Sequence, residues 1–375
     1  GIAGQRGGDF ITGLKAISSA ELVAFCEIDA QRLNTLADKY DVPGRFTRFE
    51  DMLDAVDAVV VATPMQWHAP QTIMALRAGK HVMSEVTAAV SIEECWRIID
   101  AVKESGCTYM MAENYCYRRD NVLVKEMARK GLFGDLYFGE GEYLHEVRFM
   151  HHYEDGKPTW RYYWQVGQNG STYPTHSLGP VMQWFHAVDP TERVVEVICV
   201  GSGRHTDTEH PHDDTTILLC KLKSGKLIKV RLDMMSNRPH QMTYYSLQGT
   251  RGVYEASRLE NERGHIWIGD SKDGEHRQWR PISEFEEHLP TEWRNPSDEA
   301  RKAGHGGGDY FVMRDFIDAI QTGTPPPIDV YTAMEWTAAG LCSQTSIESG
   351  GVAIKLPDFR DPAQRPIWLD AMPKW

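Results

Sequence analysis

The sequence predicts an α/β protein of two domains. The first, residues 1–118, is a doubly wound parallel sheet, and the second, residues 119–375, is an α+β domain with a large, mostly antiparallel open sheet. Three observations predict this. Short apolar segments alternate with amphipathic ones in the first third of the chain. A glycine-rich turn follows the first apolar segment. Beyond residue 134 the segments lengthen and alternate apolar with polar residues, as in a sheet with one covered face.

The first domain is expected to alternate strands with helices. Its strands are predicted at 21–29, 57–63, 81–85 and 109–112, and its helices at 30–40, 69–79 and 91–104. The strands are almost continuously apolar, which is typical of a parallel sheet covered on both faces. A strand, a glycine turn and a helix at the start of such a sheet indicate a Rossmann nucleotide-binding half.

The second domain is expected to begin with a helix at 120–131. Strands are then predicted at 135–149, 193–202, 215–223, 225–235, 241–248 and 252–256, with turns at 223–226 and 249–252. Residues 257–304 are polar and acidic and indicate an excursion from the sheet, and helices return at 308–322 and 330–348. We expect a homo-oligomer, a dimer or a tetramer, formed through the sheet of this domain.

Composition excludes several classes of function. The net charge of −13 argues against a nucleic-acid-binding protein. No stretch approaches the roughly 18 apolar residues of a membrane span. The seven cysteines lack C-x-x-C spacing, which favours reduced thiols. We expect a cytoplasmic protein, although the chain opens directly on the strand-like segment 1–4, so a leader lost upstream stays an open alternative.

The first glycine turn, residues 1–8, predicts a dinucleotide site. Backbone N–H groups at a helix N-terminus bind a pyrophosphate, and Glu27, at the end of the second strand, suits the ribose of NAD. Arg32 is close enough in sequence to keep NADP open, and Arg6 interrupts the usual glycine spacing. Loops after later strands should surround the nicotinamide. The predicted cofactor residues are Gly4, Gln5, Arg6, Gly7, Glu27, Arg32, Thr63, Trp67, His68 and Glu85.

A second stretch, residues 170–180, carries a phenol and an imidazole. Tyr173 and His176 lie between Gly170 and Pro180, at the point where a loop is expected to enter a helix. Such positions often hold a catalytic acid or base. The alternative is a capped helix start with a buried histidine.

A metal site is not predicted. His205, Asp207, His210, His212, Asp213 and Asp214 are crowded together, but their spacing matches no zinc or calcium pattern, and a solvated loop between strands is the better interpretation.

The residues resemble the glucose-fructose oxidoreductase, inositol dehydrogenase and MocA family along nearly the whole chain, through Thr63-Pro64, 78–82 and Glu85. Dehydrogenases of that family carry Glu-Lys-Pro where this chain has Glu85-Val86-Thr87. Valine cannot transfer a proton, so another residue would have to take the role of the lysine.

A narrower resemblance is to the family 109 glycoside hydrolases, the NAD-dependent α-N-acetylgalactosaminidase type. Four runs carry it, in order: 85–88, 113–117, 173–180 and 304–307. The resemblance implies a bound, recycled NAD⁺ that oxidises the sugar at C3. The C2 proton is then removed, the aglycone is eliminated, water adds and the ketone is reduced again.

The resemblance also implies roles for single residues. Tyr143 is similar to the proposed base at C2, and Tyr173 and His176 to residues at the reacting hydroxyls. Glu113, Arg161, Tyr173 and His240 are the implied substrate-binding residues. His240 replaces a tyrosine, and Arg161 has the alternative role of a structural partner of Trp160.

Two other functions stay open from the sequence. One is an NAD-dependent sugar or glycoside 3-dehydrogenase that releases NADH, with His176 in place of the lysine. The other is a non-catalytic NAD-sensing protein of the same fold. The sequence favours the glycosidase acting on a small-molecule glycoside, because the residues expected for chemistry are all present.

Overall fold

The computed structural model describes residues 1–238, 243–259, 261–269, 278–366 and 368. The chain forms two compact units. Unit 1 comprises Gly1–Tyr117, Ser297–Thr337 and Asp358–Trp375, and unit 2 comprises Arg118–Pro296 and Ala338–Pro357. The units are therefore discontinuous, whereas the division predicted from the sequence, 1–118 and 119–375, is contiguous. The difference arises because helices near the C-terminus pack back onto the first domain.

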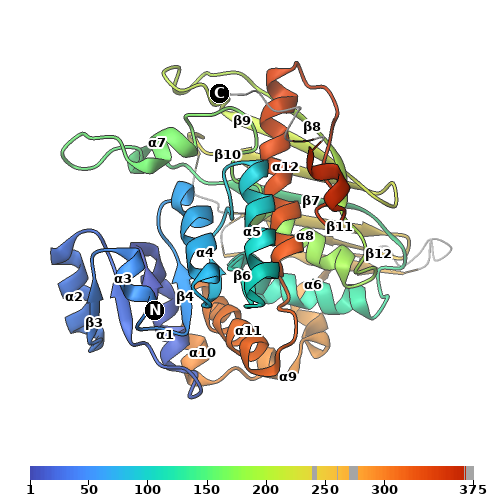
Figure 1. Cartoon of the computed structure of the whole chain (residues 1–375). Coiled ribbons are helices and arrows are strands. Elements are labelled where there is room, and N and C mark those ends of the chain that lie inside the picture. Colours follow the sequence, from blue (N-terminus) through green and yellow to red (C-terminus); the bar gives the residue numbers. More distant parts are fainter. Residues whose placement is uncertain (239–242, 260, 270–277, 367, 369–375) are drawn as a thin grey trace. The chain divides into compact units, whose positions relative to one another are not determined.

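Unit 1 contains a six-stranded parallel sheet with the order β3-β2-β1-β4-β5-β6 (Figure 1). This is the strand order of a Rossmann sheet, with the switch point between β1 and β4, so the predicted fold is confirmed. The strands are β1 (Ile2–Ala3), β2 (Ala24–Cys26), β3 (Gly44–Phe46), β4 (Ala58–Val61), β5 (His81–Ser84) and β6 (Tyr109–Met111).

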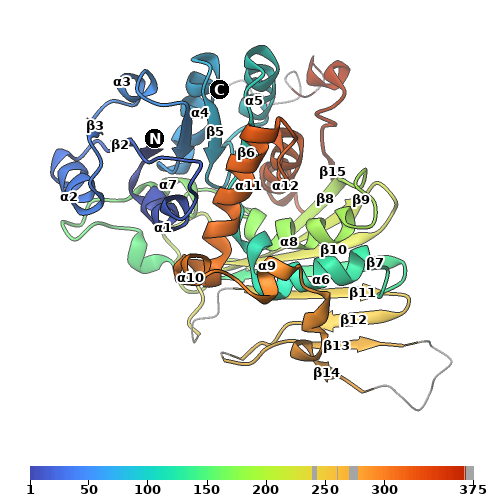
Figure 2. The same ribbon diagram turned by 90° about the horizontal axis from the view of Figure 1, so that it is seen from below.

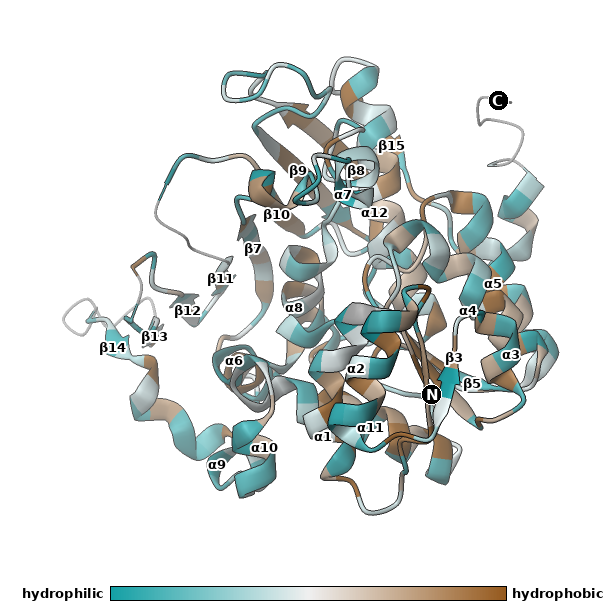
Figure 3. Cartoon of the chain, turned by 90° about the vertical axis from the view of Figure 1, so that its left-hand side faces the viewer, coloured by the Kyte–Doolittle hydropathy of each residue, from teal (hydrophilic) through white to brown (hydrophobic). Residues whose placement is uncertain are grey.

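Helices surround this sheet, and Figure 3 shows the apolar strands between helices whose outer faces are hydrophilic. They are α1 (Ile11–Lys15), α2 (Ala30–Tyr40), α3 (Phe49–Leu53), α4 (His68–Arg77), α5 (Ile92–Ser105), α10 (Asp298–Lys302) and α11 (Gly308–Thr322). Short 3₁₀ segments are η1 (Gln5–Phe10), η2 (Met65–Trp67), η3 (Asn114–Tyr117), η6 (His305–Gly307) and η7 (Pro362–Gln364). Strand β3 was not predicted, because three residues with intermediate or high exposure give no apolar run.

Unit 2 contains a nine-stranded sheet with the order β14-β13-β12-β11-β7-β10-β9-β8-β15. Strand β10 pairs with β7 in parallel, and the other pairs are antiparallel, which confirms the mostly antiparallel prediction. The strands are β7 (Leu136–Leu144), β8 (Val194–Gly201), β9 (Thr215–Leu222), β10 (Leu227–Asp233), β11 (Thr243–Gly249), β12 (Gly252–Glu255), β13 (His265–Ile268), β14 (Arg280–Pro281) and β15 (Ile354–Lys355).

Helices α6 (Arg119–Arg129) and α8 (Thr175–His186) lie together on one face of this sheet (Figure 2). The unit also contains α7 (Trp160–Trp164), α9 (Thr291–Arg294), η4 (Arg148–Met150) and η5 (Ile282–His288). Helix α12 (Val330–Glu348) contributes residues 330–337 to unit 1 and 338–348 to unit 2. The polar region 257–304 was predicted as an excursion, yet it adds β13 and β14 to the sheet edge, where the polar composition hides the short strands.

Strand β7 presents two different faces, because successive side chains point to opposite sides of a strand. Glu140 and Glu142 lie on one face, where Glu140 pairs with Lys229. On the same face Arg258 binds both carboxylate oxygens of Glu142, at 2.9 and 3.2 Å. The opposite face carries two glycines and a tyrosine and meets α8. These charged residues alternate with uncharged ones, and this alternation is the pattern that predicted a strand within 135–149.

In the part of the chain that the structure describes, no helix combines the length and the apolar character needed to cross a membrane.

Candidate active site

Three residues predicted to do chemistry come together in unit 2. The ring of His176 lies 5.0 Å from that of Tyr143 and 5.1 Å from that of Tyr173, measured between centroids, and the two tyrosine rings are 5.8 Å apart. The side chains are almost buried, with exposures of 5%, 9% and 8% for Tyr143, Tyr173 and His176. We call these three residues the Tyr-Tyr-His cluster. An imidazole and two phenols in contact can hold and move protons.

The loop before α8 fixes two members of this cluster. The amide of Ser171 donates to Oγ of Ser343 at 2.8 Å, and Thr172 Oγ1 donates to the carbonyl of Gln165 at 2.8 Å. Helix α8 then begins after Pro174, whose carbonyl accepts from the amide of Leu178 at 2.8 Å. Tyr173 therefore lies just before the helix and His176 lies in its first turn, which confirms the predicted entry of a loop into a helix.

A proline inside α8 frees one backbone carbonyl. Pro180 has no N–H group, so it cannot bond the carbonyl of the residue four positions earlier, which is His176. The hydroxyl of Tyr245, on β11, donates to that carbonyl at 2.5 Å. The backbone of His176 is thus tied to the sheet beneath it by Tyr245, a contact that was not predicted from the sequence.

Strand β7 approaches α8 so closely that a side chain cannot stand between them. A Cβ atom on Gly141 would lie 2.2 Å from the carbonyl oxygen of Ser177. Because Gly139, Gly141 and Tyr143 alternate along one face, the two glycines let the helix settle on the strand and Tyr143 emerges beside His176. The spacing Gly139-x-Gly141-x-Tyr143 was visible in the sequence, but it does not show which helix packs on that face.

Arg161 lies in α7, in the same unit as the cluster. Its Nη1 donates to Oε1 of Gln165 at 2.9 Å, and its guanidinium lies 4.5 Å from the centroid of the Trp160 ring. The structural role left open by the sequence is therefore present. Gln165 connects this arginine to Thr172, one residue before Tyr173.

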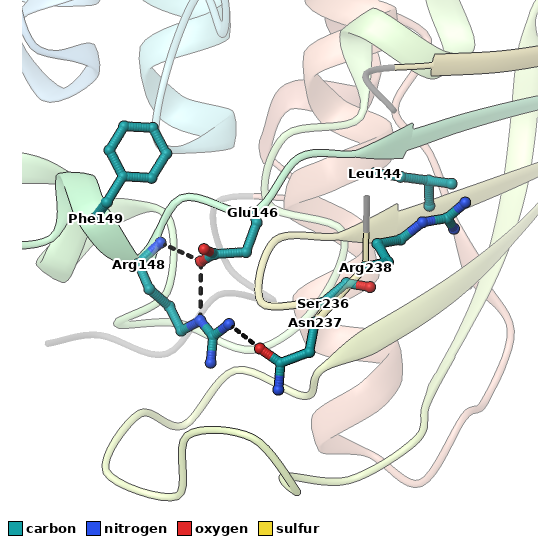
Figure 4. Close-up of a pocket in the computed structure, with 7 residues that line it drawn as sticks. All are labelled: Leu144, Glu146, Arg148, Phe149, Ser236, Asn237 and Arg238. Carbon is teal, nitrogen blue, oxygen red and sulfur yellow. Dashed lines mark hydrogen bonds and ion pairs between the residues drawn. The ribbon is translucent and has the colours of Figure 1, made fainter. Parts of the chain in front are cut away.

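Unit 2 also contains a cavity of about 450 Å³. Figure 4 shows the residues that line it, from Leu144 at the end of β7 to Arg238. Its polar lining includes Arg148, whose Nε contacts Oε1 of Glu146 at 2.9 Å and whose guanidinium also donates to Asn237. Glu146 therefore offsets the charge of Arg148. His240, predicted to bind substrate, lies outside the described residues.

Unit 1 holds the predicted acid Glu113 directly after β6. Its side chain is fully buried, and its Oε1 accepts from the amide of Tyr115 at 3.2 Å. Nearby, His305 contacts the buried carboxylate of Asp309 at 2.9 Å, and Asn114 Nδ2 donates to the same carboxylate at 3.3 Å. Asp309 was not predicted together with the run 304–307, because its contact with Asn114 joins residues 195 positions apart.

The glycine turn after β1 fits a dinucleotide. Gly4 has φ of 90°, and a Cβ atom there would lie 2.4 Å from the carbonyl oxygen of Ala62. Backbone therefore approaches backbone at the switch point of the sheet, where nucleotides bind in such folds. Gln5 begins η1, and Gly7 packs against Ile2. The turn is compatible with a pyrophosphate even though Arg6 interrupts the glycine spacing.

The charged residues near the turn form two separate sets of contacts, one around Arg6 and one around Glu27. Arg6 pairs with Asp9 and approaches Oε1 of the buried Glu85 at 3.5 Å. Glu27, at the end of β2, accepts from the amide of Asp29 at 3.2 Å.

Arg32 is exposed on the first turn of α2 and lies 3.6 Å from Asp29. The carboxylate of Asp29 also caps that helix by accepting from two backbone amides. Glu27 and Arg32 thus remain on adjacent segments, as expected, and the acid is the less exposed of the two.

The three predicted cofactor residues in the loop after β4 and at the start of α4 make different contacts. His68 is buried, and its Nδ1 and Nε2 each lie 2.7 Å from a backbone carbonyl, of Thr87 and Thr63 respectively. Burial lowers the pKa of His68 despite these carbonyls. Thr63 donates its hydroxyl to Gln71 at 2.7 Å, whereas Trp67 is 53% exposed. His68 therefore holds two loops together, and Trp67 leaves an aromatic surface accessible.

Two models of known protein families match this chain, one at each end of the sequence. Residues 1–113 match the family model described as an oxidoreductase family with an NAD-binding Rossmann fold, and residues 117–364 match the model of the glycosyl hydrolase 109 C-terminal domain. The structure is similar to that of levoglucosan dehydrogenase in complex with NADH, with a TM-score of 0.78 and 18% identity, covering 95% of this chain and 98% of that one. A probable dehydrogenase from Thermotoga maritima gives a TM-score of 0.70, also at 18% identity, covering 94% and 97% of the two chains.

Two curated relatives are similar along their sequences. A glycosyl hydrolase family 109 protein of Shewanella pealeana is 31% identical, covering 95% of this chain and 83% of the relative. An alpha-N-acetylgalactosaminidase of Tannerella forsythia is 31% identical, covering 99% of this chain and 86% of the relative. With an NAD-binding Rossmann unit, a buried Tyr-Tyr-His cluster and a family match over most of its length, the chain belongs to glycosyl hydrolase family 109, the glycosidases built on an oxidoreductase fold.

Proposed function

We propose that this glycosidase cleaves its substrate by recycling a tightly bound NAD⁺. The sugar is oxidised at C3, the C2 proton is lost and the aglycone is eliminated; water then adds and the ketone at C3 is reduced again, which restores NAD⁺. The observation that supports this most strongly is the Tyr-Tyr-His cluster. It supplies proton-transfer groups in a chain that has Val86 where dehydrogenases of this fold carry a lysine. A pair of carboxylates, which ordinary glycosidases require, is not needed for such an elimination.

We propose one role in the chemistry for each member of the cluster. His176 accepts the proton of the C3 hydroxyl, since imidazole exchanges protons near neutral pH and this ring has two phenols as neighbours. Tyr143 removes the C2 proton, which the carbonyl at C3 makes acidic. Tyr173 hydrogen-bonds the reacting hydroxyl and keeps it oriented toward His176. Roles in binding the sugar are proposed for Glu113, Arg161 and His240 because these positions resemble the sugar-binding positions of the family.

The residues of unit 1 would hold the cofactor. The turn at Gly4 and Gly7 would bind the pyrophosphate, and Glu27 the adenosine ribose. Gln5, Arg6, Arg32, Thr63, Trp67, His68 and Glu85 complete the proposed set. When bound, the nicotinamide supplies reversible hydride transfer. The chain's own part is to orient the sugar and move protons.

We propose an uncharged glycoside, with an N-acetylgalactosaminide as the first to test. A relative that matches 99% of this chain is named an alpha-N-acetylgalactosaminidase. Two cationic residues of unit 2 that could attract an anionic sugar are already paired: Arg148 contacts Glu146, and Lys157 contacts Asp155 at 2.8 Å. Each pairing reduces the attraction that these cations would offer to a sulfonated or carboxylated sugar.

One experiment tests the mechanism. The purified protein is incubated in D₂O with 4-nitrophenyl α-N-acetylgalactosaminide and a set of other aryl glycosides, and the sugar is examined by NMR while absorbance at 340 nm is recorded. We expect hydrolysis, deuterium at C2 and no net NADH. Stoichiometric NADH with an intact glycosidic bond would show a 3-dehydrogenase instead. Hydrolysis without deuterium at C2 would contradict the elimination, and no turnover of any glycoside would contradict the proposal as a whole.

A further inference from the structure

Unit 2 brings together three metal-ligand side chains from two separate segments. His151 follows η4, whereas Asp207 and His210 lie in the loop between β8 and β9. One ligand atom from each lies within 4.8 Å of the other two. The local spacing of Asp207, His210 and their neighbours in this loop predicted no metal. Local spacing does not show that a histidine more than fifty positions earlier completes the group.

The burial of the two imidazoles is unusual for a solvated loop. His151 is 2% exposed and His210 is 3% exposed, and their rings lie 5.0 Å apart between centroids. The Nε2 atom of His151 is buried and has no hydrogen-bond partner among the described residues. A buried polar nitrogen without a partner is rare in folded proteins and points to a missing ligand.

Asp207 is placed to supply the third ligand. Its Oδ1 accepts from the amide of Glu209 at 3.0 Å, which fixes the carboxylate. Its Oδ2 lies 3.7 Å from Nε2 of His210. Two ligands that each lie ~2.0–2.1 Å from one ion are themselves roughly 3–4 Å apart, so this separation suits a shared ion better than a direct hydrogen bond. The aspartate is 26% exposed, which leaves a path from solvent.

Hydrogen bonds hold both segments in place. The amide of His151 donates to the carbonyl of Arg148 at 3.1 Å, and its carbonyl accepts from the amide of Thr159 at 2.8 Å. In the other loop, the amides of His205 and Thr206 both donate to Oδ2 of Asp214, at 3.1 and 2.9 Å. The three ligands are therefore presented by anchored backbone, as a preorganised site requires.

We propose that His151, Asp207 and His210 bind one divalent transition-metal ion, with Zn²⁺ as the expected metal. Two imidazoles and one carboxylate favour Zn²⁺ and its first-row neighbours over Ca²⁺ or Mg²⁺, which take oxygen ligands. Three protein ligands leave a fourth position for water or another small ligand. The ion joins the segment after η4 to the loop between β8 and β9. None of the three ligands belongs to the Tyr-Tyr-His cluster, and the inference does not rest on the proposed function.

The test uses the full chain without a histidine tag, stripped of metal by dialysis against a chelator. Co²⁺ is titrated and followed by its visible absorption, Zn²⁺ is then added to displace it, and bound metal is counted by mass spectrometry. We expect one Co²⁺ per chain, displaced by Zn²⁺, and a rise in Tm with Zn²⁺ because the ion binds the folded state.

Asp207→Asn and His210→Gln should each weaken Co²⁺ binding by at least ~10-fold, because even the loss of groups that only orient ligands costs 10–100-fold. His205→Gln is the matched control, since His205 is an exposed histidine of the same loop, and its affinity should equal that of the wild type. Asp207→Asn preserves the side-chain shape, and an unchanged Tm without metal shows that it folds. Equal affinity in all four proteins, or binding of no Co²⁺, would overturn the proposal.

Discussion

The two units use histidine in opposite ways. In unit 1, both ring nitrogens of His68 face backbone carbonyls at 2.7 Å, so the side chain joins two loops. In unit 2, His176 is tied down through its backbone carbonyl by Tyr245, and its ring is surrounded by phenols. Burial alone therefore does not separate a histidine that joins two loops from one for which we propose a role in proton transfer.

The largest effect that tests this comparison is expected from His176→Ala. If the ring moves protons, the substitution should lower kcat by ~10²–10⁴-fold, the usual contribution of a general acid or base. Bound NAD, measured by chromatography after denaturation, should be unchanged. His205→Ala, an exposed histidine of the same unit, should retain full activity. Near-normal turnover by the His176 variant would remove this residue from the mechanism.

Tyr143→Phe separates the proton transfer at C2 from the rest of the cycle. Phenylalanine keeps the ring packed beside His176 but cannot accept a proton. We expect a loss of at least ~10²-fold in the rate of deuterium incorporation at C2, measured by NMR. Tyr137→Phe, at an exposed position of the same strand, is the control. Exchange at the wild-type rate in the Tyr143 variant would assign the base to another group.

Much of this arrangement could be predicted from the sequence. The doubly wound parallel sheet of unit 1 follows from alternating apolar and amphipathic segments, whereas its strand order comes from the structure. The loop-to-helix position of Tyr173 and His176 follows from their flanking glycine and proline residues. The contact between Tyr143 and His176 could not be derived from spacing, because it depends on β7 and α8 lying almost in backbone contact at Gly141. The long-range partners Tyr245 and Asp309 were missed for the same reason, since local patterns carry no information on pairing across a sheet or between helices.

The glycine turn of unit 1 offers the next test. Gly4→Ala places a Cβ atom 2.4 Å from the Ala62 carbonyl oxygen and imposes a left-handed backbone on alanine. Such strain costs ~1–3 kcal/mol, so we expect lower stability in urea and less copurified NAD. At Gly8, in the same segment, an added Cβ meets nothing within 4 Å. Gly8→Ala should therefore change stability less, and equal losses in both variants would contradict the steric explanation.

Tyr245→Phe tests the anchor of His176 with a smaller expected effect. Removing the hydroxyl leaves a buried carbonyl without the bond that Pro180 also cannot provide, which should cost ~1–3 kcal/mol in the free energy of unfolding. We expect a several-fold fall in kcat with KM little changed, because the ring of His176 is less well oriented. Tyr244→Phe is the matched control: its hydroxyl pairs with Glu255 on the opposite face of β11. A larger loss of kcat in the control would refute the positioning role of Tyr245.

The smallest effect concerns His68 and the stability of unit 1 in acid. Burial lowers the pKa of His68 below the value of the unfolded chain, so the unfolded state binds a proton that the folded state resists. Its contribution to stability is therefore present above the unfolded pKa of ~6.5 and is lost as the pH falls below it. Hydrogen exchange at pH 7.5 and 5.5, corrected for intrinsic rates, should show weaker protection of the loops around Thr63 and Thr87 at the lower pH. In His68→Gln the two protection patterns should differ less. An unchanged difference would mean that a group other than His68 causes the loss of protection in acid.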